Sequence, residues 1–512
     1  MNLASVLSRN ARRHPEKEAL VFEGKRYTYA QLDGATNSMA QALIGMGLKK
    51  GEKVALLLQN SDRFVVSYYG ILKAGGVVVP LNFRLAAPEI SYILENSDSK
   101  IFIYDPEFSP LVGGIRDQLR GIEKFIVAGE PSDPAWEISW QDLLDQNPPL
   151  QPDVEVGLED DCEILYTSGT TGRPKGALFD DYRIFTVGLN MIVGMGINPK
   201  DRIIHVAPLF HSAQLNLFLV SGTYVGATHI VLKAFEPRKV LQTIQEEKVT
   251  HLFAVPAMYN LMIQLPDFDQ YDLSSLQRCA YGAAPMPANQ VQRVMARFKN
   301  DQFYNLCGLT EGGPGGIYLL PEDQVRKAGA GGKPIINTEA RVVNDRGEDV
   351  KPGEVGEWLI RGETIMKGYY KNPAATAETF LGDWLKTGDL ATIDEEGYIT
   401  LVDRKKDMII TGGENVYSTE VEAVVAGHPK VMDVAVIGIP HEVWGETVAC
   451  LVVPRPGQEL GLEELRSFCQ GKLADFKIPR IVINTTTLPR NASGKVLKTV
   501  LRSQYKNTGK ST

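Results

Sequence analysis

The sequence predicts an α/β protein: a large N-terminal domain of layered α/β subdomains with a small barrel-like β region, followed by a small α+β C-terminal domain. Three observations lead to this prediction. The chain has 512 residues, too many for one hydrophobic core. Short apolar runs alternate with helical patterns up to about residue 335, which is typical of parallel sheets covered by helices. Beyond that point, strands follow one another across glycine-rich turns.

The N-terminal elements follow from local patterns. A helix is expected over residues 28–47, because Thr28 and Gln31 can form a capping box and Gly45 and Gly47 can end it. The apolar stretch 215–232 contains two glycines and several polar residues, so it predicts a buried helix followed by a strand and not a membrane span. Strands are expected within 53–60, 100–105, 202–208, 228–232 and 250–256.

The C-terminal elements begin after "VDRKKD", residues 402–407. A helix is expected from Thr419, with Glu422 completing a capping box and Gly427 ending it. Strands are expected at 431–440 and 447–454, and a second helix over 462–476. We therefore expect an N-terminal domain over residues 1–402, a hinge at 403–406 and a C-terminal domain over 407–512.

Composition excludes several classes of protein. A net charge of −8 gives no electrostatic reason to bind nucleic acid or an anionic membrane. The five cysteines have no spacing suited to zinc or to a disulfide framework, and the N-terminus has no apolar core typical of a signal peptide. We expect a cytoplasmic protein, a monomer or homodimer, for which peripheral membrane association stays open.

The segment "YTSGTTGRPKGA", residues 166–177, is the most informative loop of the chain. Its glycines let backbone N–H groups curl around an anion, its serine and threonines add hydroxyl donors, and Lys175 adds a full charge. It follows the strand-like run "EILY", so it is interpreted as a phosphate-binding turn and not as a flexible surface linker. It is not a Walker A loop, because Lys175 is followed by Gly176 and not by serine or threonine.

This loop resembles the signature loop of the acyl-adenylate-forming superfamily, which includes acyl-CoA synthetases, luciferases and peptide-synthetase adenylation domains. Five further motifs follow in the family order: "YGAAPMP" at 281–287, "NLCGLTE" at 305–311, "WLKTGDL" at 384–390, "VDRKKDMIITGGENVY" at 402–417 and "NASGKVLK" at 491–498. The resemblance implies ATP-dependent activation of a carboxylic acid to acyl-AMP with release of pyrophosphate, then transfer to coenzyme A. It also implies that the C-terminal domain is mobile.

The resemblance assigns roles around the nucleotide. Lys495 would reach the carboxylate and the α-phosphate, Thr310 would contact the α-phosphate, and Glu311 would hold Mg²⁺. Asp389 would accept bonds from the ribose, with Arg404 beside it. The β- and γ-phosphates would lie in the loop formed by Thr167, Ser168, Gly169, Thr170, Thr171, Gly172 and Lys175, and the adenine along Gly282, Ala283, Ala284 and Pro285.

The remaining roles concern the second half-reaction and one departure from the family. Lys406 matches the hinge position, and Gly412, Gly413 and Glu414 match the segment that faces the acceptor. Cys307 stands where the family usually has an aromatic residue that stacks on adenine. Without this ring, either the enzyme binds ATP more weakly, or another ring such as Tyr304 stacks on the adenine instead.

The acyl pocket is expected around His211, Gln214 and Gly308, with "GGPGG" at 312–316. These segments carry no lysine or arginine for a second carboxylate, which favours an apolar fatty or aryl acid. The glycines suggest room, although other side chains could fill it. A fatty-acid–CoA ligase of medium- to long-chain type is the first hypothesis. The alternatives are an aryl-acid ligase, an adenylating enzyme that loads a separate carrier protein, and an inactive binding protein.

Overall fold

The computed structural model describes residues 2–167, 173–284, 286–490, 496–506 and 508. The chain forms two compact units. Unit 1 consists of residues 1–326, Pro334–Glu339 and Ile360–Leu385, and unit 2 of Lys327–Lys333, Ala340–Leu359 and residues 386–512. Residues 403–406, where the sequence predicts a hinge, fall within unit 2. The hinge and the domain boundaries stay predictions.

A nine-stranded sheet forms one layer of unit 1, with the order β16-β15-β14-β13-β12-β10-β11-β1-β2. Strands β14, β13, β12, β10, β11 and β1 are parallel, while β15 and β2 run antiparallel to their neighbours. The strands are β1 (Glu18–Phe22), β2 (Lys25–Thr28), β10 (Arg202–His205), β11 (Thr228–Val231), β12 (His251–Ala254), β13 (Arg278–Gly282), β14 (Phe303–Gly308), β15 (Gly316–Leu319) and β16 (Lys333–Pro334).

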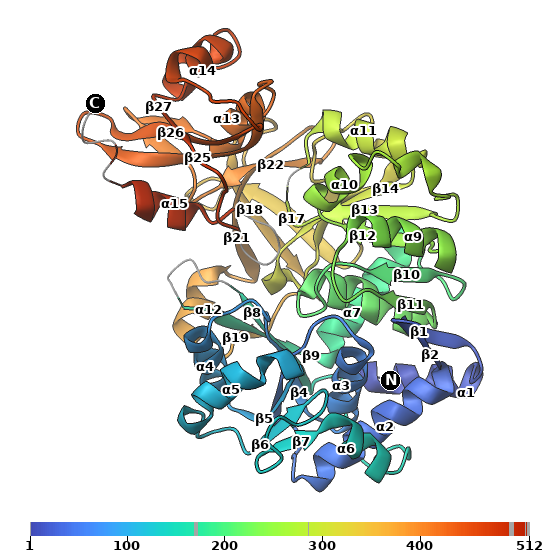
Figure 1. The fold of residues 1–512 in the computed structure, drawn as a ribbon. Helices are drawn as coiled ribbons and strands as arrows, with labels where there is room; N and C mark the ends of the chain where they lie inside the picture. Colours follow the sequence, from blue (N-terminus) through green and yellow to red (C-terminus); the bar gives the residue numbers. More distant parts are fainter. Residues whose placement is uncertain (1, 168–172, 285, 491–495, 507, 509–512) are drawn as a thin grey trace. The chain divides into compact units, whose positions relative to one another are not determined.

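Helices cover both faces of this sheet. On one face lie α9 (Pro237–Glu247), α10 (Pro256–Ile263) and α11 (Ala288–Phe298), whose apolar side chains share a buried cluster with β10, β11, β12 and β13 (Figure 1). A second cluster joins other side chains of the same strands to α7 (Asp181–Met195) and to the π-helix Ala213–Val220. The alternation of strands and helices predicts α/β layering with parallel strands, and the sheet covered on both faces confirms it.

An eight-stranded sheet forms the second layer of unit 1, with the order β19-β9-β8-β4-β3-β5-β6-β7. Six of these strands run parallel: β8, β4, β3, β5, β6 and β7. Strand β9 is antiparallel to β8, and β19 is antiparallel to β9. Helices α4 (Ala87–Asn96) and α5 (Ser109–Ile115) pack on one face. The strands are β3 (Lys53–Leu57), β4 (Val77–Pro80), β5 (Ser99–Tyr104), β6 (Lys124–Val127), β7 (Glu137–Ser139), β8 (Asp161–Thr167), β9 (Lys175–Asp180) and β19 (Gly368–Tyr369).

The predicted N-terminal elements are confirmed. Helix α2 (Tyr29–Gly45) has the expected capping box, in which Thr28 Oγ1 accepts from Gln31 N and Gln31 Oε1 accepts from Thr28 N. The stretch 215–232 forms buried helix and then β11, but its first part is the π-helix and its second is α8 (Ser221–Val225). Among the described residues, no helix combines the length and apolarity needed to cross a membrane.

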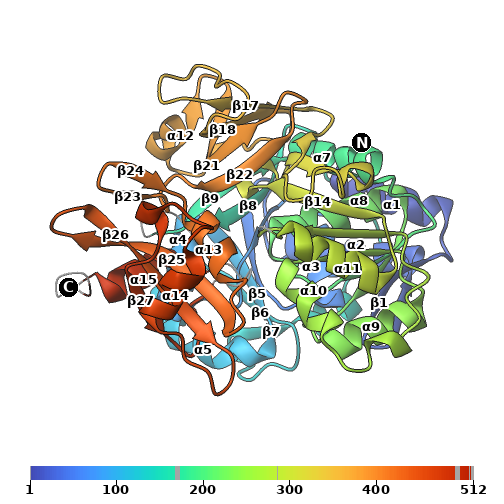
Figure 2. The same ribbon diagram turned by 90° about the horizontal axis from the view of Figure 1, so that it is seen from above.

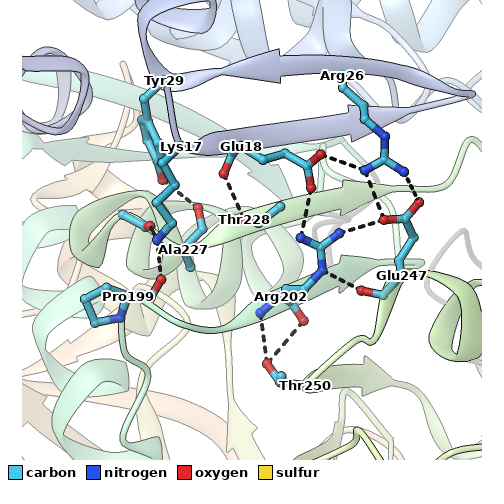
Figure 3. Close-up of polar contacts among 11 residues, drawn as sticks. Lys17, Glu18, Arg26, Tyr29, Pro199, Arg202, Ala227, Thr228, Glu247 and Thr250 are labelled. Carbon is cyan, nitrogen blue, oxygen red and sulfur yellow. Dashed lines mark hydrogen bonds and ion pairs between the residues drawn. The ribbon is translucent and has the colours of Figure 1, made fainter. Parts of the chain in front are cut away.

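Four charged side chains link the N-terminal hairpin β1–β2, at one edge of the nine-stranded sheet, to β10 and α9 (Figure 3). Arg26 of β2 donates to Glu18 (2.6 Å) and Glu247, and Arg202 of β10 donates to Glu18 (2.8 Å) and to Glu247 (2.6 Å). Two guanidinium groups and two carboxylates thereby form a closed ring that spans two strands of the hairpin, β10 and α9. Beside it, Tyr29 Oη donates to Ala227 O at 2.6 Å.

A five-stranded sheet carries the barrel-like region, with the order β17-β18-β21-β20 and β22 paired with β21. The pairs β20–β21 and β21–β22 are antiparallel, as the glycine-rich turns predict. The strands are β17 (Thr338–Val343), β18 (Gly356–Gly362), β20 (Phe380–Leu381), β21 (Trp384–Ile393) and β22 (Ile399–Arg404).

The C-terminal part of unit 2 is a small α+β fold on its own sheet, β24-β23-β26-β25 with β27 paired with β26. Helices α13 (Ser418–Val425) and α14 (Leu462–Cys469) share a buried cluster with the strands, and α15 (Lys498–Tyr505) contributes Leu501 to another (Figure 2). The strands are β23 (Ile409–Thr411), β24 (Glu414–Val416), β25 (Val431–His441), β26 (Gly445–Pro454) and β27 (Ile481–Asn484).

Two predicted helix boundaries in this region are wrong. Helix α13 begins one residue before Thr419, and its N-cap residue Tyr417 makes no side-chain cap. Thr419 Oγ1 donates to Val402 O and Glu422 Oε1 accepts from Val436 N, so both side chains serve tertiary contacts. The second helix ends at Cys469 and not at residue 476, because Gly471 takes a positive φ of 73° and a 3₁₀ turn follows at Asp475–Lys477.

Candidate active site

The predicted site residues of unit 1 gather at the carboxyl ends of parallel strands. Strand β8 ends at Thr167, β13 at Gly282 and β14 at Gly308, while β10 ends at His205, shortly before His211. Gly282 and Leu306 are register partners, so the "GAAP" segment and Cys307 leave adjacent strands at the same edge. Open α/β sheets bind their ligands at this edge.

Glu311 is the residue on which the contacts converge. It lies in a short 3₁₀ turn, Thr310–Gly312, directly after β14. Thr167 Oγ1 donates to Glu311 Oε1 at 3.0 Å, and Tyr369 Oη donates to the same oxygen at 2.9 Å. The main chain is held as well, because Met366 N donates to Glu311 O at 2.9 Å. Among the described residues, no recorded hydrogen bond reaches Oε2.

Lys175 begins β9 and is the register partner of Thr167 across the β8–β9 hairpin. Its Nζ lies 5.0 Å from the centroid of the Tyr369 ring, within the range of a cation–π contact. The position after Lys175 requires glycine because neighbouring side chains lie too close for a Cβ atom. A Cβ at Gly176 would lie 2.6 Å from Ile164 Cγ2 and 3.0 Å from Tyr166 Cζ, so any side chain there would collide with these two side chains of strand β8.

Burial raises the pKa of the Tyr369 phenol, and the negative charge of Glu311 raises it further. The phenol therefore stays protonated at neutral pH and acts as a hydrogen-bond donor to the carboxylate. Thr310, the other member of the predicted pair, lies next to the segment that follows β10. Its Oγ1 is 3.3 Å from Ser212 Oγ. The structure thus brings Thr167, Lys175, Thr310 and Glu311 close together, and their roles toward a ligand stay predictions.

The predicted adenine segment is shaped by close backbone approach. A Cβ at Gly282 would lie 2.3 Å from Leu306 O, so this position excludes every side chain. Ala283 follows with a φ of 63°, a conformation that residues with a Cβ rarely adopt and that occurs often at functional sites. Ala283 and Ala284 are exposed, as a surface for a flat ligand requires.

Tyr304 is wrong as a substitute for the missing aromatic residue. It lies three residues before Cys307 on β14, so the two side chains point to opposite faces of the strand. Tyr304 is 8% exposed and packs in the cluster with α7 and the π-helix. Cys307 itself is half-buried at the end of the strand. Neither residue therefore provides an aromatic ring at the predicted adenine position.

The two polar residues of the predicted acyl pocket, His211 and Gln214, differ in burial and in hydrogen bonding. His211 is half-buried after β10, and burial lowers its pKa, so the ring is neutral at pH 7. Gln214 is fully buried at the start of the π-helix, where Nε2 contacts His205 Nδ1 at 2.8 Å and Oε1 accepts from Ala207 N at 3.3 Å. These contacts engage both ends of the Gln214 amide within the protein, and its role toward a ligand stays a prediction.

The glycines around Gly308 do not leave the room that the sequence suggests. A Cβ at Gly308 would lie 2.2 Å from Pro314 O, and one at Gly313 would lie 2.2 Å from Thr364 O. At Gly315 the neighbour is Thr364 Oγ1, at 2.8 Å. Neighbouring backbone and side chains fill this space, so the glycines serve close packing of the loop after Glu311.

Unit 2 holds the predicted ribose and hinge residues. Asp389 and Arg404 are register partners on β21 and β22, and Arg404 Nε lies 2.5 Å from Asp389 Oδ1. Lys406 is exposed, and its carbonyl accepts from Arg502 Nη1 at 2.7 Å. Gly412 and Gly413 form the two-residue turn of the β23–β24 hairpin with φ of 61° and 86°, and Glu414 is exposed beside it. The hairpin itself therefore needs these glycines.

Seven predicted site residues lie outside the described residues. They are Ser168, Gly169, Thr170, Thr171, Gly172, Pro285 and Lys495.

Sequence reasoning missed two residues of the site, Tyr369 and Ser212. Ser212 adjoins the noted His211, but a lone serine carries no pattern. Tyr369 lies 58 residues after Glu311, and only the pairing of β19 with β9 brings it back to the hairpin. An aromatic residue after the glycine of "KGYY" was the only local signal.

Comparisons with known proteins agree with this geometry. The family model of AMP-binding enzymes matches residues 7–370, and that of the AMP-binding enzyme C-terminal domain matches residues 420–495. The chain is 39% identical to the long-chain-fatty-acid–CoA ligase FadD13 of Mycobacterium tuberculosis over 99% of both chains. It is 37% identical to a feruloyl-CoA synthase of Amycolatopsis sp, covering 98% of this chain and 99% of the relative.

A solved structure shares the fold. The anthranilate CoA ligase AuaEII in complex with anthranoyl-AMP is 31% identical, with a TM-score of 0.92, over 100% of this chain and 98% of that one. Family models, near-full-length relatives and this structure therefore agree that the chain belongs to the AMP-binding enzymes, the acyl-adenylate-forming superfamily, as an AMP-forming acid–thiol ligase.

Proposed function

We propose that this protein activates a fatty acid with ATP to acyl-AMP, releases pyrophosphate and transfers the acyl group to coenzyme A. The observation that carries the proposal is the convergence of Thr167, Lys175, Thr310 and Glu311 where β8 and β14 end. A carboxylate oxygen is a poor leaving group, and joining it to AMP creates a good one. The enzyme must therefore hold a polyanion against an anion and neutralise the charge that develops in the transition state.

In this proposal Lys175 and the loop before it hold the β- and γ-phosphates, and Thr310 donates to the α-phosphate. Glu311 would hold Mg²⁺, and its surroundings fit that ion. Both recorded bonds go to Oε1, and the described residues form no cluster of three or more acidic, histidine or cysteine ligands. Mg²⁺ is commonly held by one or two carboxylates together with substrate phosphates, whose charge it neutralises.

The acid is proposed from the segment that follows β10. Residues 205–220 contain no lysine, arginine or carboxylate, and His211 is neutral. Phe83 and Phe210 pack edge to face at 5.2 Å beside it. These features suit an apolar acid, and the similarity to a fatty-acid–CoA ligase supports a fatty acid. An aryl acid is the second candidate, because a feruloyl-CoA synthase is nearly as similar.

Unit 2 carries the residues proposed to bind the ribose and those proposed to change places between the two half-reactions. Asp389 would accept hydrogen bonds from the ribose hydroxyls, with Arg404 holding its carboxylate in place. Lys495 would contact the carboxylate and α-phosphate during adenylation. Rotation at Lys406 would then turn Gly412, Gly413 and Glu414 toward the thiol acceptor. Free coenzyme A is the proposed acceptor, and a carrier protein is the alternative.

The proposal is tested with a panel of fatty and aryl acids, ATP and Mg²⁺. Exchange of labelled pyrophosphate into ATP reports adenylation, and mass spectrometry of added coenzyme A reports the thioester. Glu311→Gln keeps an oxygen for Thr167 and Tyr369 but removes the charge, so exchange should fall about 10²–10³-fold. The exposed Glu322→Gln is the matched control and should exchange like wild type.

The outcomes separate the candidates. Thioesters of fatty acids alone support the first candidate, and thioesters of aryl acids alone support the second. Exchange without consumption of coenzyme A points to a carrier protein. Absence of exchange with every acid, or equal activity of Glu311→Gln and wild type, contradicts the proposed site.

A further inference from the structure

We propose that Tyr369 is a positioning residue that holds Glu311 and Lys175 apart, so that each charge stays available to the magnesium nucleotide. The inference rests on the proposed function of this site. Its basis is the juxtaposition of three groups: the phenol oxygen on the Glu311 carboxylate, the ring face under the Lys175 ammonium, and the short strand that places the ring between them.

Strand pairing fixes where the ring lies. Strand β19 runs antiparallel to β9, with Tyr369 opposite Ala177. Lys175 is two residues before Ala177 on the same strand, so it is the diagonal neighbour of Tyr369 on one face of the sheet. Diagonal neighbours of this kind are within reach of long and aromatic side chains, and the Nζ-to-centroid distance of 5.0 Å shows the contact.

The backbone of Tyr369 is held independently of the site. Tyr369 N donates to Thr376 Oγ1 at 2.9 Å. A Cβ at Gly368, which has a φ of 146°, would lie 2.9 Å from Thr376 Cγ2, so only glycine lets α12 (Pro373–Thr379) approach this closely. The backbone of Tyr369 is therefore anchored by α12, separately from the contacts of the ring with Glu311 and Lys175.

Two contacts from one segment then fix Glu311. Met366 N donates to the carbonyl of Glu311, and Tyr369 Oη donates to its carboxylate. The main chain and the side chain of Glu311 thus share one support. Within the described part of the chain, both hydrogen bonds to the carboxylate use Oε1, so Oε2 is the oxygen proposed to face a cation.

The separation of charges is the functional point. An ammonium and a carboxylate that meet directly form an ion pair, and each then attracts phosphate or metal less strongly. No ion pair joins Lys175 to Glu311 among the described residues, because the ammonium contacts the face of Tyr369 and the carboxylate contacts its hydroxyl. Tyr369 contacts both charged groups without carrying a charge itself, and these contacts are weaker than an ion pair. The ammonium and the carboxylate can therefore still bind phosphate and metal.

The test compares three variants with wild type. Tyr369→Phe removes the hydroxyl and keeps the ring, and Tyr369→Leu removes both. Tyr370→Phe is the matched control, because Tyr370 Oη donates to the Asp98 carboxylate at 2.8 Å, on the other face of the same chain segment. Binding of a non-hydrolysable ATP analogue is measured by calorimetry with Mg²⁺ and with EDTA, and thermal unfolding checks the fold.

Tyr369→Phe should weaken binding of the analogue about 10-fold with Mg²⁺ and leave binding in EDTA unchanged, since a hydrogen bond to a charged group is lost. Tyr369→Leu should weaken binding in EDTA as well, by about 3- to 5-fold, since the cation–π contact is lost. Pyrophosphate exchange by Tyr369→Phe should need a correspondingly higher Mg²⁺ concentration, while Tyr370→Phe follows wild type.

Equal binding by Tyr369→Phe and Tyr370→Phe with Mg²⁺ would overturn the inference, as would the same loss with and without Mg²⁺. Failure of the proposed function looks different. Wild type would then bind the magnesium nucleotide without exchanging pyrophosphate for any acid, and the comparison of binding constants would still decide the role of Tyr369.

Discussion

Cys307 is the residue at which a single substitution can test the predicted adenine site. It stands at the carboxyl end of β14, one strand away from Gly282, and the backbone of the "GAAP" segment approaches so closely that it carries no side chain at Gly282. On the side of the "GAAP" segment, the predicted adenine site is therefore bounded by backbone and alanine. A half-buried thiol at position 307 offers a base little π-surface, and Tyr304 belongs to the core.

Cys307→Phe is expected to tighten ATP binding. Stacking on an aromatic side chain is worth roughly 1–3 kcal/mol per base, so the KM for ATP in pyrophosphate exchange should fall about 5- to 100-fold. Cys307→Ser changes the thiol without adding a ring and should leave this KM near the wild-type value. An unchanged or higher KM for ATP in Cys307→Phe, with the KM for the acid unaltered, would show that adenine does not lie against this strand end.

At this scale the sequence grouped the residues of the distinctive motifs better than it predicted the space around the pocket residues. Lys175, Thr310 and Glu311 stand in motifs whose order along the chain is distinctive, and the structure brings them together. The glycines at 308–315 were expected to leave room, because composition does not reveal which neighbours fill the space. Tyr369 escaped notice because its partners come from β9 and from the turn after β14.

Among the elements, the π-helix Ala213–Val220 is held beside the proposed acyl pocket by buried polar contacts. Gln214 Nε2 contacts His205 Nδ1 at 2.8 Å, His205 Nε2 lies 2.9 Å from His229 Nδ1, and His229 Nε2 lies 3.1 Å from Thr223 Oγ1. Asn216 Nδ2 donates to Glu163 Oε2 at 3.1 Å, and burial raises the pKa of Glu163 to about 7. These contacts tie the helix to β10, β11 and β8 beside the proposed acyl pocket.

The buried histidines make stability depend on pH. Burial lowers the pKa of His229 to about 3, so below its ordinary value of 6.5 the unfolded chain takes up a proton that the folded chain refuses. This stability is present above pH 6.5 and is lost as the pH falls toward 3. His229→Gln removes the effect, so the loss of unfolding free energy between pH 6.5 and 4.5 should be smaller than in wild type by about 2 kcal/mol.

Urea unfolding at the two pH values measures this difference. The exposed His14→Gln is the matched control and should keep the wild-type dependence. Equal slopes for wild type and His229→Gln would mean that His229 is protonated in the folded protein, against the direction that burial gives.

A second buried polar group shows why a helix start was misjudged. Ser418, the first residue of α13, donates from both N and Oγ to Asp403 Oδ2, at 2.6 and 2.7 Å. Lys498 Nζ donates to Ser418 Oγ at 2.6 Å and pairs with Glu422 at 2.7 Å. The pattern from Thr419 to Glu422 fits a local capping box, but the Asp403 carboxylate of β22 holds the first residue of the helix and Lys498 of α15 engages Glu422. Such long-range partners cannot be seen in a local window.

For the whole molecule, the order of the motifs along the chain predicted the fold class. The alternation of strand-like and helical segments predicted the parallel sheets, and the glycine-rich turns after residue 335 predicted the antiparallel region. What the sequence could not supply is how a strand as short as β19 returns to the hairpin β8–β9 across almost two hundred residues. Pairing of distant strands depends on contacts throughout unit 1, which no local pattern encodes.

The division of the chemistry between chain segments gives the last prediction. Lys495 belongs to the "NASGKVLK" motif near the end of the chain, whereas Lys175, Thr310 and Glu311 belong to unit 1. If Lys495 donates to the transition state of adenylation alone, Lys495→Ala should lower pyrophosphate exchange about 10²–10³-fold. Thioester formation from preformed acyl-AMP and coenzyme A should persist, because the proposed rotation at Lys406 would turn Gly412, Gly413 and Glu414, in place of Lys495, toward the reacting groups in that step. Stopped-flow and quenched-flow measurements of the two steps make the comparison, with the exposed Lys506→Ala as control. A parallel loss in both steps would assign Lys495 to nucleotide binding throughout the cycle, and a loss in the second step alone would assign it to the acceptor.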